Sequence, residues 1–468
     1  MQKDQLVEFF DKAAGSRDRW RKRNWYYHRA IENLARFVIP EGESVIEIGS
    51  GTGDLLASLK PSRGVGVDIS PAMTEFARQK YPRLEWRVDD AEDLHVGERF
   101  DYIVMSDLIG YVDDIEKVFY NLGKVSHPRT KVLVTQYNYI WEPLLRFSES
   151  LGFKARQPLQ NWLSGKDIEN LLYLGGFEVV KSGNRLVFPV YIPLVSWFLN
   201  AVMGNLPLLN RLGVIQYFVA RPIPGGGGEH TVSIVIPCRN ERGNIEQAVA
   251  RLPHFGSYSE IIFVEGHSTD GTLEEIKRVA DAYAGRRNIR WTVQDGKGKG
   301  DAVRKGFAMA KGDVLIILDA DLAVAPEDMP KFYEAIRSGR GEFANGSRLV
   351  YPMEKEAMRF LNTIANKFFS IMFSWLLGQR LKDTLCGTKA LFKKDYERIA
   401  AARSYFGDFD PFGDFDLLFG AAKLGLKIVE LPVRYHARTY GTTNIQRWKH
   451  GWILLKMVLF AMRKIKFV

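Results

Sequence analysis

Two aspartates separated by one residue, Asp319 and Asp321, follow directly on an apolar run at 314–318. The run predicts a buried strand, and ligands of open α/β sheets bind beyond the carboxyl ends of such strands. Carboxylate oxygens suit Mg²⁺ or Mn²⁺, which often take phosphate oxygens as further ligands. The pair therefore predicts a clamp for a metal ion and a diphosphate. Taken alone, it fits equally well a turn in which one aspartate caps a helix at 325–327.

The sequence upstream of the two aspartates favours the metal clamp, because more loops with polar side chains adjoin predicted strands and helices. A predicted strand at 231–237 leads into polar residues at 238–241, and a second, at 260–264, leads into the turn 265–272. A glycine-rich basic loop at 296–300 then enters a helix. Because parallel strands of one sheet end at the same edge, we expect these loops to face a ribose or phosphate there.

In this order, the segments SIVIPCRNERGNI, IIFVEGHSTDGT, GKGKGDAVRKGF and VLIILDADL resemble family 2 glycosyltransferases with a GT-A fold. The later segments NGSR, DTLCGTKALF and ELPVRYHARTYGTTN are similar to the dolichol-phosphate mannose synthase branch, and the resemblance covers about residues 229 to 447. It implies Mg²⁺ or Mn²⁺ on Asp319 and Asp321, with Arg348 and Arg438 as cations for an acceptor phosphate. It implies that a nucleotide-sugar donor is bound by Pro237, Asn240, Glu241, Glu265, Asp270, Lys299 and Asp319.

The resemblance also implies inversion at the anomeric carbon by direct displacement, while the metal and cations offset charge on the leaving nucleoside diphosphate. An acceptor phosphate needs no base, whereas an alcohol needs a carboxylate to take its proton. Asp414 lies near where the family has its catalytic acid and is the candidate base; capping of a helix is its alternative role.

Two departures from the family pattern affect these expectations. Glu265-Gly266-His267 stands where relatives commonly carry Asp-Asp, which leaves the base of the donor open. Leu322-Ala323 stands where many relatives have Gln, so we expect metal ligation to lean on Asp321 with waters.

The first half of the chain carries a different series of polar strand ends. A predicted strand at 44–48 breaks into the glycine-rich turn 49–54, and glycines there let a backbone approach a ligand closely. The next predicted strand ends in Asp68, which is placed to accept the hydroxyls of a ribose. Two further predicted strands end in Asp89-Asp90-Ala91 and in Ser106-Asp107. These four ends describe one ligand crevice.

The segments EIGSGTGDLLASL, GVDIS, DDAEDL and FDYIVMSDLIGY resemble class I S-adenosylmethionine-dependent methyltransferases over about residues 30 to 185. The resemblance implies a seven-stranded Rossmann-like sheet. It implies that S-adenosylmethionine is bound by Glu47, Gly49, Gly51, Gly53, Asp68, Asp90, Ala91 and Ser106. It does not identify the methyl acceptor. His28, Tyr26, Tyr137 and Trp141 are candidates for an acceptor pocket, and each reads more readily as a core or surface residue.

The domain organisation follows from length and composition. A chain of 468 residues, 46% of them hydrophobic, is too long for one ordinary core. We predict an α/β fold with two Rossmann-like domains, a methyltransferase sheet at 1–222 and a GT-A sheet at 231–468. Residues 223–230, rich in Pro and Gly, form the predicted linker. The Pro-broken apolar segment 187–220 is expected to be helical.

The charge distribution predicts contact with an anionic membrane surface. The formal net charge is +10, and residues 433–468 hold eight Lys or Arg, no acid and many apolar side chains. Such a segment suits a lipid interface, and a solvated helix with a core-facing stripe is the alternative. Only two cysteines and no apolar signal core lead us to expect a peripheral protein at the cytoplasmic face of a membrane. Neither half shows the recognition helix or stacking platform of a nucleic-acid binder.

The sequence therefore predicts an inverting hexosyltransferase that acts on a lipid-linked acceptor such as polyprenyl phosphate, fused to a methyltransferase, in the synthesis of an envelope glycan. A soluble transferase that builds a methylated glycan or natural product is one alternative. A membrane-recruited scaffold with a SAM-binding domain that no longer transfers methyl is another.

Overall fold

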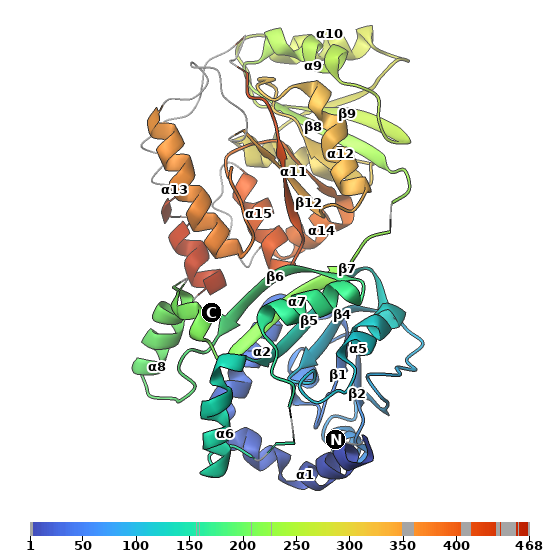
Figure 1. The fold of residues 1–468 in the computed structure, drawn as a ribbon. Coiled ribbons are helices and arrows are strands. Elements are labelled where there is room, and N and C mark those ends of the chain that lie inside the picture. Colours follow the sequence, from blue (N-terminus) through green and yellow to red (C-terminus); the bar gives the residue numbers. More distant parts are fainter. Residues whose placement is uncertain are drawn as a thin grey trace. The chain divides into compact units, whose positions relative to one another are not determined.

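The chain divides into two compact units, Met1–Ile223 and Pro224–Ile465, each with its own sheet (Figure 1). The computed structural model describes residues 3–155, 157–158, 160–206, 208–225, 227–348, 360–403, 413–436, 440, 455–456 and 458–466. At 360–368, 414 and 465–466 it describes the backbone alone. The predicted α/β class with two Rossmann-like sheets is confirmed.

The first unit holds a seven-stranded sheet of order β3-β2-β1-β4-β5-β7-β6. Its strands are β1 (Ser44–Ile48), β2 (Arg63–Asp68), β3 (Glu85–Val88), β4 (Phe100–Ser106), β5 (Ser126–Tyr137), β6 (Phe177–Arg185) and β7 (Ile215–Pro222). Strands β1 to β5 run parallel, and β7 runs antiparallel to both β5 and β6. The carboxyl ends of β1 to β4 therefore meet at one edge, as the polar strand ends predict.

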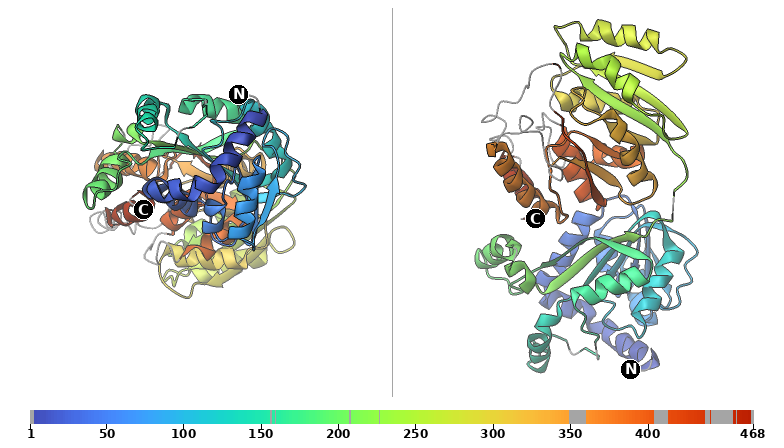
Figure 2. Two further views of the ribbon diagram at one scale, coloured as in Figure 1. Left: turned by 90° about the horizontal axis from the view of Figure 1, so that it is seen from below. Right: turned by 45° about the horizontal axis from the view of Figure 1, so that its top comes forward.

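Helices flank this sheet, and the N-terminal pair lies at the end where β1 to β4 finish (Figure 2). The helices are α1 (Lys3–Arg23), α2 (Trp25–Val38), α3 (Asp54–Ser58), α4 (Pro71–Lys80), α5 (Ile115–Asn121), α6 (Glu142–Ser150) and α7 (Gly165–Leu174). Helix α4 begins at Ser70, whose hydroxyl accepts a hydrogen bond from Met73 N at 3.1 Å. The Asp11 carboxylate accepts hydrogen bonds from that hydroxyl and from Ala72 N, which fixes α1 against α4.

The expectation of a helical segment at 187–220 is wrong for its last part. Short helical turns, α8 (Val195–Trp197), η3 (Phe198–Val202), η4 (Met203–Asn205) and η5 (Leu209–Leu212), occupy the middle. Residues from Ile215 onward instead form β7, which is buried along almost its whole length between β5 and β6. The strand is buried on both faces and includes the buried polar residues Gln216 and Arg221, so its sequence lacks the alternation that marks a half-exposed strand.

The second unit holds a mixed seven-stranded sheet of order β10-β9-β8-β11-β13-β12-β14. Its strands are β8 (Thr231–Cys238), β9 (Tyr258–Glu265), β10 (Asn288–Val293), β11 (Val314–Ile317), β12 (Phe343–Ser347), β13 (Lys389–Phe392) and β14 (Ile428–Pro432). Strands β10, β9, β8 and β11 are parallel, whereas β13 runs antiparallel to β11 and β12.

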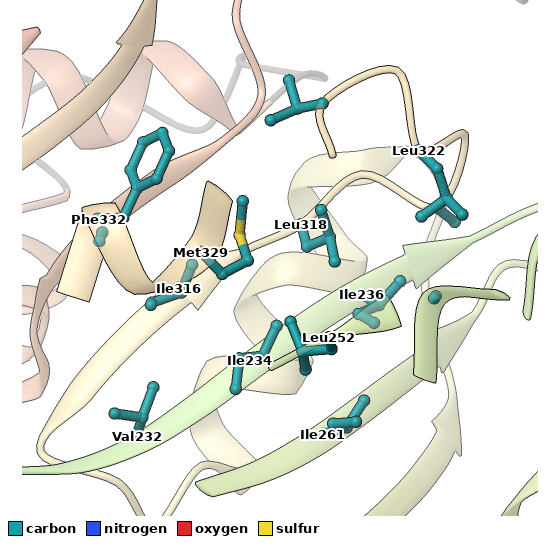
Figure 3. Packing of buried hydrophobic residues seen from close by; sticks show 14 of the residues in the cluster. Val232, Ile234, Ile236, Leu252, Ile261, Ile316, Leu318, Leu322, Met329 and Phe332 are labelled. Carbon is teal, nitrogen blue, oxygen red and sulfur yellow. The ribbon is translucent and has the colours of Figure 1, made fainter. Parts of the chain in front are cut away.

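Helices of the second unit pack on the faces of this sheet, and α13 packs against α15. They are α9 (Ile245–Arg251), α10 (Thr272–Ala282), α11 (Lys299–Met309), α12 (Met329–Arg337), α13 (Phe360–Leu377), α14 (Lys393–Ala401) and α15 (Asp414–Lys423). On one face, Ile234 and Ile316 contribute to a buried cluster with Met329 and Phe332 of α12 (Figure 3). This core fixes β8 and β11 side by side, and so fixes the loops that follow them.

The expected membrane-contacting segment at 433–468 lies largely outside the described residues. Its described part includes the helical turn η9 (Met462–Lys466). Within the part of the chain that the structure describes, no helix is long and apolar enough to cross a bilayer.

Candidate active sites

The first unit contains a cavity of about 600 Å³ at the carboxyl ends of its central strands. Helices α1 and α2 and the segments around α6 and 189–191 form its other walls. Among the residues predicted to bind S-adenosylmethionine, those that line the cavity are Glu47, Gly49, Gly51, Asp68, Asp90, Ala91 and Ser106. The described cavity therefore collects residues that are far apart in the sequence, because the parallel strands end side by side.

Two glycines of the first turn have conformations that a side chain would strain. Gly49 has φ +77°, and a Cβ added there would lie 2.9 Å from Leu108 Cδ1. Gly51 has φ +52° and faces open space. Gly51 N also donates a hydrogen bond of 2.7 Å to Asp68 Oδ2, and Ser70 N donates one of 2.9 Å to Asp68 Oδ1. The turn thus orients the Asp68 carboxylate while it leaves room for a ligand.

Gly53 lies apart from the cavity lining, in contrast to the expectation from the motif. It has φ +81° and precedes α3, and a Cβ there would overlap the Trp86 ring. The residue therefore permits close packing of α3 on β3. Its role in this structure is to bring backbone and indole together.

Glu47 is a buried acid on which the effect of burial outweighs the charge of Arg21. It is 3% exposed, and its Oε2 accepts a hydrogen bond of 2.9 Å from Leu56 N. Burial raises the pKa of Glu47 to about 8, and burial also raises the pKa of Asp68. A ligand that carries an ammonium or sulfonium group would stabilise the ionised acids, so this residue set fits S-adenosylmethionine.

The candidates for an acceptor pocket, Tyr26, His28, Tyr137 and Trp141, all line the same cavity. Burial and the charges of Arg21 and Arg17 lower the pKa of His28 to about 3, so its ring is neutral near pH 7. The Trp141 indole N–H donates a hydrogen bond of 2.7 Å to Leu212 O, and Tyr26 Oη accepts one from Asn200 at 3.0 Å. Trp141 and Tyr26 therefore hold the segment 189–212 at the cavity.

Asp107, directly after β4, is a cavity residue that we did not single out from the sequence. Tyr27 Oη donates a hydrogen bond of 2.8 Å to its Oδ2, and the Tyr27 ring stacks on Tyr137 with centroids 5.1 Å apart. Burial raises the pKa of Asp107 to about 6. The available signal was an acid at a strand end, which the sequence shows but which does not reveal the contact with Tyr27.

In the second unit, Asp319 and Asp321 lie in the turn after β11, where Leu318 N still donates to Val235 O of β8. Lys299, the first residue of α11, places its Nζ 2.5 Å from Asp319 Oδ1. Burial by itself would raise the pKa of Asp319, but Lys299 outweighs it and holds that pKa below its usual range. Asp321 Oδ1 accepts a hydrogen bond of 3.1 Å from Ala323 N.

Gly387 lets the backbone approach this acid and lysine closely. A Cβ at Gly387 would overlap both Lys299 Nζ and Asp319 Oδ2. The segment DTLCGTKALF therefore passes directly against the acid pair. Among the described residues, no group of three or more His, Cys, Asp and Glu side chains could hold a metal ion. A metal on Asp319 and Asp321 would accordingly need oxygens from a substrate or from water.

The expected nucleotide-binding residues shape the loops at the same sheet edge. Glu265 accepts hydrogen bonds from His267 N at 3.1 Å and Ser268 N at 2.6 Å, and Asn240 Oδ1 accepts one from Thr269 N at 2.9 Å. These contacts join the loop after β8 to the loop after β9.

The remaining expected donor-binding residues make similar loop contacts. Asp270 accepts a hydrogen bond from Thr272 N at 3.1 Å at the start of α10. The Glu241 carboxylate accepts one from Asn244 at 2.7 Å, and Pro237 lies within β8.

Arg348 is engaged by a carboxylate in the structure. Its Nε and Nη2 donate hydrogen bonds of 2.7 and 2.8 Å to the two oxygens of Asp383, and its guanidinium lies 5.1 Å from the Tyr435 ring centroid. Asp383 has a fully buried side chain. Asp383 outweighs the effect of burial and raises the pKa of Arg348. The charge expected to meet an acceptor phosphate is thus already compensated.

The structure describes only the backbone of one of the two remaining expected catalytic residues, Asp414, and none of the other, Arg438. Asp414 is the first residue of α15, whose N-cap is Gly413 with φ +72°, and its side chain lies outside the described set. A Cβ at Gly413 would lie 2.6 Å from Gly300 Cα, so α15 begins beside the start of α11. Arg438 lies outside the described residues.

Comparisons with known proteins give a separate family match for each unit. Residues 19–182 match the family model described as a methyltransferase domain, and residues 233–399 match the model of glycosyl transferase family 2. A dolichol-phosphate mannosyltransferase from Pyrococcus furiosus is 32% identical over 222 residues, which are 46% of this chain and 59% of that protein. Glycosyltransferase AglD from Haloferax volcanii is 28% identical over 233 residues, 48% of this chain and 36% of that protein.

This chain therefore spans less than two thirds of the length of either relative. Among solved structures, a SAM-dependent methyltransferase from Thermotoga maritima, described as a possible histamine N-methyltransferase, covers 46% of this chain and 99% of its own. Its identity is 19% and its TM-score 0.37, too distant to carry an argument about function. The family models therefore match a methyltransferase domain in the first unit and a glycosyl transferase family 2 domain in the second.

Proposed function

We propose that the second unit is an inverting glycosyltransferase that moves a hexose from a nucleotide-diphosphate sugar to polyprenyl phosphate, and that the first unit is an S-adenosylmethionine-dependent methyltransferase. The observation that carries the glycosyltransferase half is the position of Asp319 beside Lys299, with Asp321 in the same turn, at the edge where β8 and β9 also end. The match to family 2 supports a nucleotide-sugar donor. The dolichol-phosphate mannosyltransferase relative supports a lipid phosphate as acceptor.

The candidate site residues of the second unit have separate roles in the proposed glycosyl transfer. Asp319 and Asp321 would hold Mg²⁺ or Mn²⁺, which when bound supplies a Lewis acid to the diphosphate. Asn240, Glu265 and the neighbouring loop residues shape the nucleoside site. Lys299 would donate to a phosphate oxygen. The acceptor phosphate is an anion and attacks without a base; with an alcohol acceptor, Asp414 is the proposed base.

The first unit would bind S-adenosylmethionine in the 600 Å³ cavity. Asp68 would accept hydrogen bonds from ribose hydroxyls, and Asp90 with Ala91 would lie beside the adenine. The turn at Gly49 and Gly51 would leave room for the methionine part of the cofactor. When bound, the cofactor supplies an electrophilic methyl group.

Exposed apolar side chains on the first unit support action at a membrane surface. They lie on 190–212 and on α6, two segments that both contribute to the rim of the cavity. Leu194 is 82% exposed, Leu208 76% and Trp197 61%. Exposed apolar side chains that gather in a patch mark a lipid or protein contact. Peripheral attachment at the cytoplasmic face, with the basic segment 433–468 facing anionic lipid, is part of the proposal.

The test is transfer of radiolabel from a panel of UDP- and GDP-sugars into organic-extractable polyprenyl phosphate, with Mn²⁺, by the full chain and by Asp321→Ala. We expect metal-dependent label in the lipid phase and its loss in the variant. Donor hydrolysis without a lipid product would contradict the lipid acceptor and favour a soluble one. Donor binding without turnover, under all acceptor conditions, would contradict an active glycosyltransferase.

A further inference from the structure

Asp107 has a left-handed backbone conformation, which is uncommon for residues other than glycine. It follows β4 directly with φ +53°, while its N–H still donates a hydrogen bond of 2.9 Å to Thr135 O of β5. A left-handed conformation costs free energy for a residue other than glycine, and such positions cluster at functional sites. The next residue, Leu108, contacts Gly49 closely enough that a Cβ there would clash with it. Asp107 is therefore held beside the turn that is expected to receive the methionine part of the cofactor.

One oxygen of the Asp107 carboxylate is satisfied and the other is not. Oδ2 accepts the hydrogen bond from Tyr27, whereas Oδ1 is buried and has no hydrogen-bond partner among the described residues. Leaving a buried acceptor without a partner costs about 1–3 kcal/mol, and more for a charged group. Because Asp107 lines the cavity, a ligand that donates a hydrogen bond would supply the missing partner.

The groups around the Asp107 carboxylate favour an uncharged methyl acceptor that donates a hydrogen bond to it. Tyr27 of α2 and Tyr137 of β5 stack together at the carboxylate. The charges of Arg17 in α1 and of Lys154 after α6 act on the Asp107 carboxylate and lower its pKa, and Tyr111 also interacts with it electrostatically. The Asp107 carboxylate disfavours an acceptor carboxylate or phosphate, and a neutral amine can attack without a base. A hydroxyl group is the uncharged acceptor that gains from a buried carboxylate able to take its proton.

We propose that Asp107 is the catalytic base of methyl transfer and that the acceptor of the first unit is a hydroxyl group, with Tyr27 as a positioning residue. The inference rests on the proposed methyltransferase function. The acceptor oxygen forms a bond to the methyl carbon as the carbon–sulfur bond breaks, and the bonding pair stays on sulfur. The hydroxyl proton passes to Asp107 Oδ1 and leaves as the acid later ionises to solvent.

The acid strength of Asp107 agrees with this role. A general base is most effective when its pKa lies near the working pH, and burial brings the pKa of Asp107 to about 6. The carboxylate is then mostly ionised at pH 7 and can accept a proton there.

The test uses the full chain, with titration calorimetry of S-adenosylhomocysteine as its first measurement. Asp107→Asn should bind this compound within about threefold of wild type. Methyl transfer is then measured with one scaffold in four forms: benzyl alcohol and phenol as hydroxyl compounds, benzylamine and benzoate. Methyl α-mannoside and dolichyl phosphate mannose serve as sugar hydroxyls, free and on lipid. Asp93→Asn, an exposed acid outside the cavity lining, is the matched control.

We expect transfer to hydroxyl compounds only, with kcat lowered roughly 100-fold or more in Asp107→Asn at little change in KM. In wild type, kcat should rise with pH through an apparent pKa near 6, and Asp107→Asn should lack that rise. Tyr27→Phe removes a hydrogen bond that favours the ionised acid, so the rise should move to higher pH. The phenol, free-sugar and lipid-sugar arms identify which hydroxyl is used.

Several outcomes would overturn the inference. For wild type, they are transfer to benzoate or benzylamine in preference to every hydroxyl compound, or no transfer to any hydroxyl compound although S-adenosylhomocysteine binds. For Asp107→Asn, they are an unchanged kcat, or a loss of S-adenosylhomocysteine binding in that variant alone. If wild type itself fails to bind S-adenosylhomocysteine, the proposed methyltransferase function fails as well, which separates the two failures.

Discussion

The pKa values of the acids in the two candidate sites are shifted in opposite directions. In the first unit, burial raises the pKa of Glu47 to about 8 and that of Asp107 to about 6. In the second, Lys299 holds the pKa of Asp319 below its usual range although the residue is buried. Buried acids with raised pKa values are stabilised when a cationic ligand arrives. An acid that is already ionised and paired with lysine is prepared for a metal ion and an anionic diphosphate.

Under the proposed functions, this contrast matches each unit to a ligand of opposite charge. A methyl donor of the sulfonium type brings positive charge into the first cavity. A sugar nucleotide brings negative charge to the second sheet edge, where lysine and a metal would balance it. The same residue type, aspartate at a strand end, serves both because its surroundings decide its charge.

The largest expected effect is a loss of glycosyl transfer, without a loss of methyl transfer, in Asp321→Ala. Asp321→Ala should lower glycosyl transfer by roughly 10³-fold or more, because the loss of a metal ligand removes several kcal/mol of transition-state stabilisation. Methyl transfer by the same variant should stay within about twofold of wild type. Product formation is measured for both reactions, and Asp281→Ala, an exposed acid on α10, is the control. Equal loss of both reactions would contradict independent sites.

The second prediction asks whether Arg348 is structural. Because its ion pair with Asp383 is buried, Arg348→Met should lower the free energy of unfolding by about 3–5 kcal/mol. Urea unfolding of the full chain measures this. If Arg348→Met keeps its stability and loses only glycosyl transfer to a phosphate acceptor, Arg348 contacts the acceptor and the ion pair opens on binding.

The third prediction concerns the cofactor turn. Gly51 has φ +52° and faces the open cavity, so Gly51→Leu should weaken S-adenosylhomocysteine binding by about 100-fold or more through strain and occupied volume. Glycosyl transfer should be unchanged. The matched control is Gly97→Leu, since Gly97 also faces open space but has no positive φ. Calorimetric titration gives both affinities, and similar values for the two variants would contradict the role of this turn.

The smallest effect concerns pH and unfolding. Because the folded pKa of Glu47 is raised from 4.5 to about 8, the folded first unit binds protons more tightly than the unfolded chain. Its stability should fall as pH rises from about 5 to 8, by on the order of 3 kcal/mol, and Glu47→Gln should flatten that fall. Asp319 has a lowered pKa, so its contribution is lost only as pH falls below about 4.

Scanning calorimetry across pH checks this, with the transition of the first unit identified as the one that S-adenosylhomocysteine shifts. If the free energy of unfolding of that unit instead rises between pH 5 and 8, the raised pKa of Glu47 is contradicted.

The sequence predicted both sheets, and most of the residues it assigned to the cofactor line the cavity. Apolar runs that end in Gly or Asp indicate buried strands and their carboxyl ends. Glu47, Asp68 and Asp319 could be assigned from such local patterns. Strand β7 was missed because it is buried on both sides and carries no alternation. The roles of Gly53 and Arg348 were not predictable either. Each depends on a partner distant in sequence, the Trp86 ring and the Asp383 carboxylate.

The role of Asp107 was also only partly predictable from the sequence. Its place at a strand end was visible, but its contact with Tyr27 joins residues eighty positions apart, and its left-handed backbone leaves no mark in the sequence. Charge balance between distant groups is set by the fold. It is therefore the part of a site that sequence patterns report least.

The most direct test of two separate transferase sites is a crossed assay on the full chain. One reaction mixture contains polyprenyl phosphate, Mn²⁺, a ¹⁴C-labelled sugar nucleotide, ³H-methyl S-adenosylmethionine and a hydroxyl acceptor. We predict that Asp321→Ala loses only the ¹⁴C product and that Gly51→Leu loses only the ³H product. Loss of both labels in either variant, or of neither, would contradict the account.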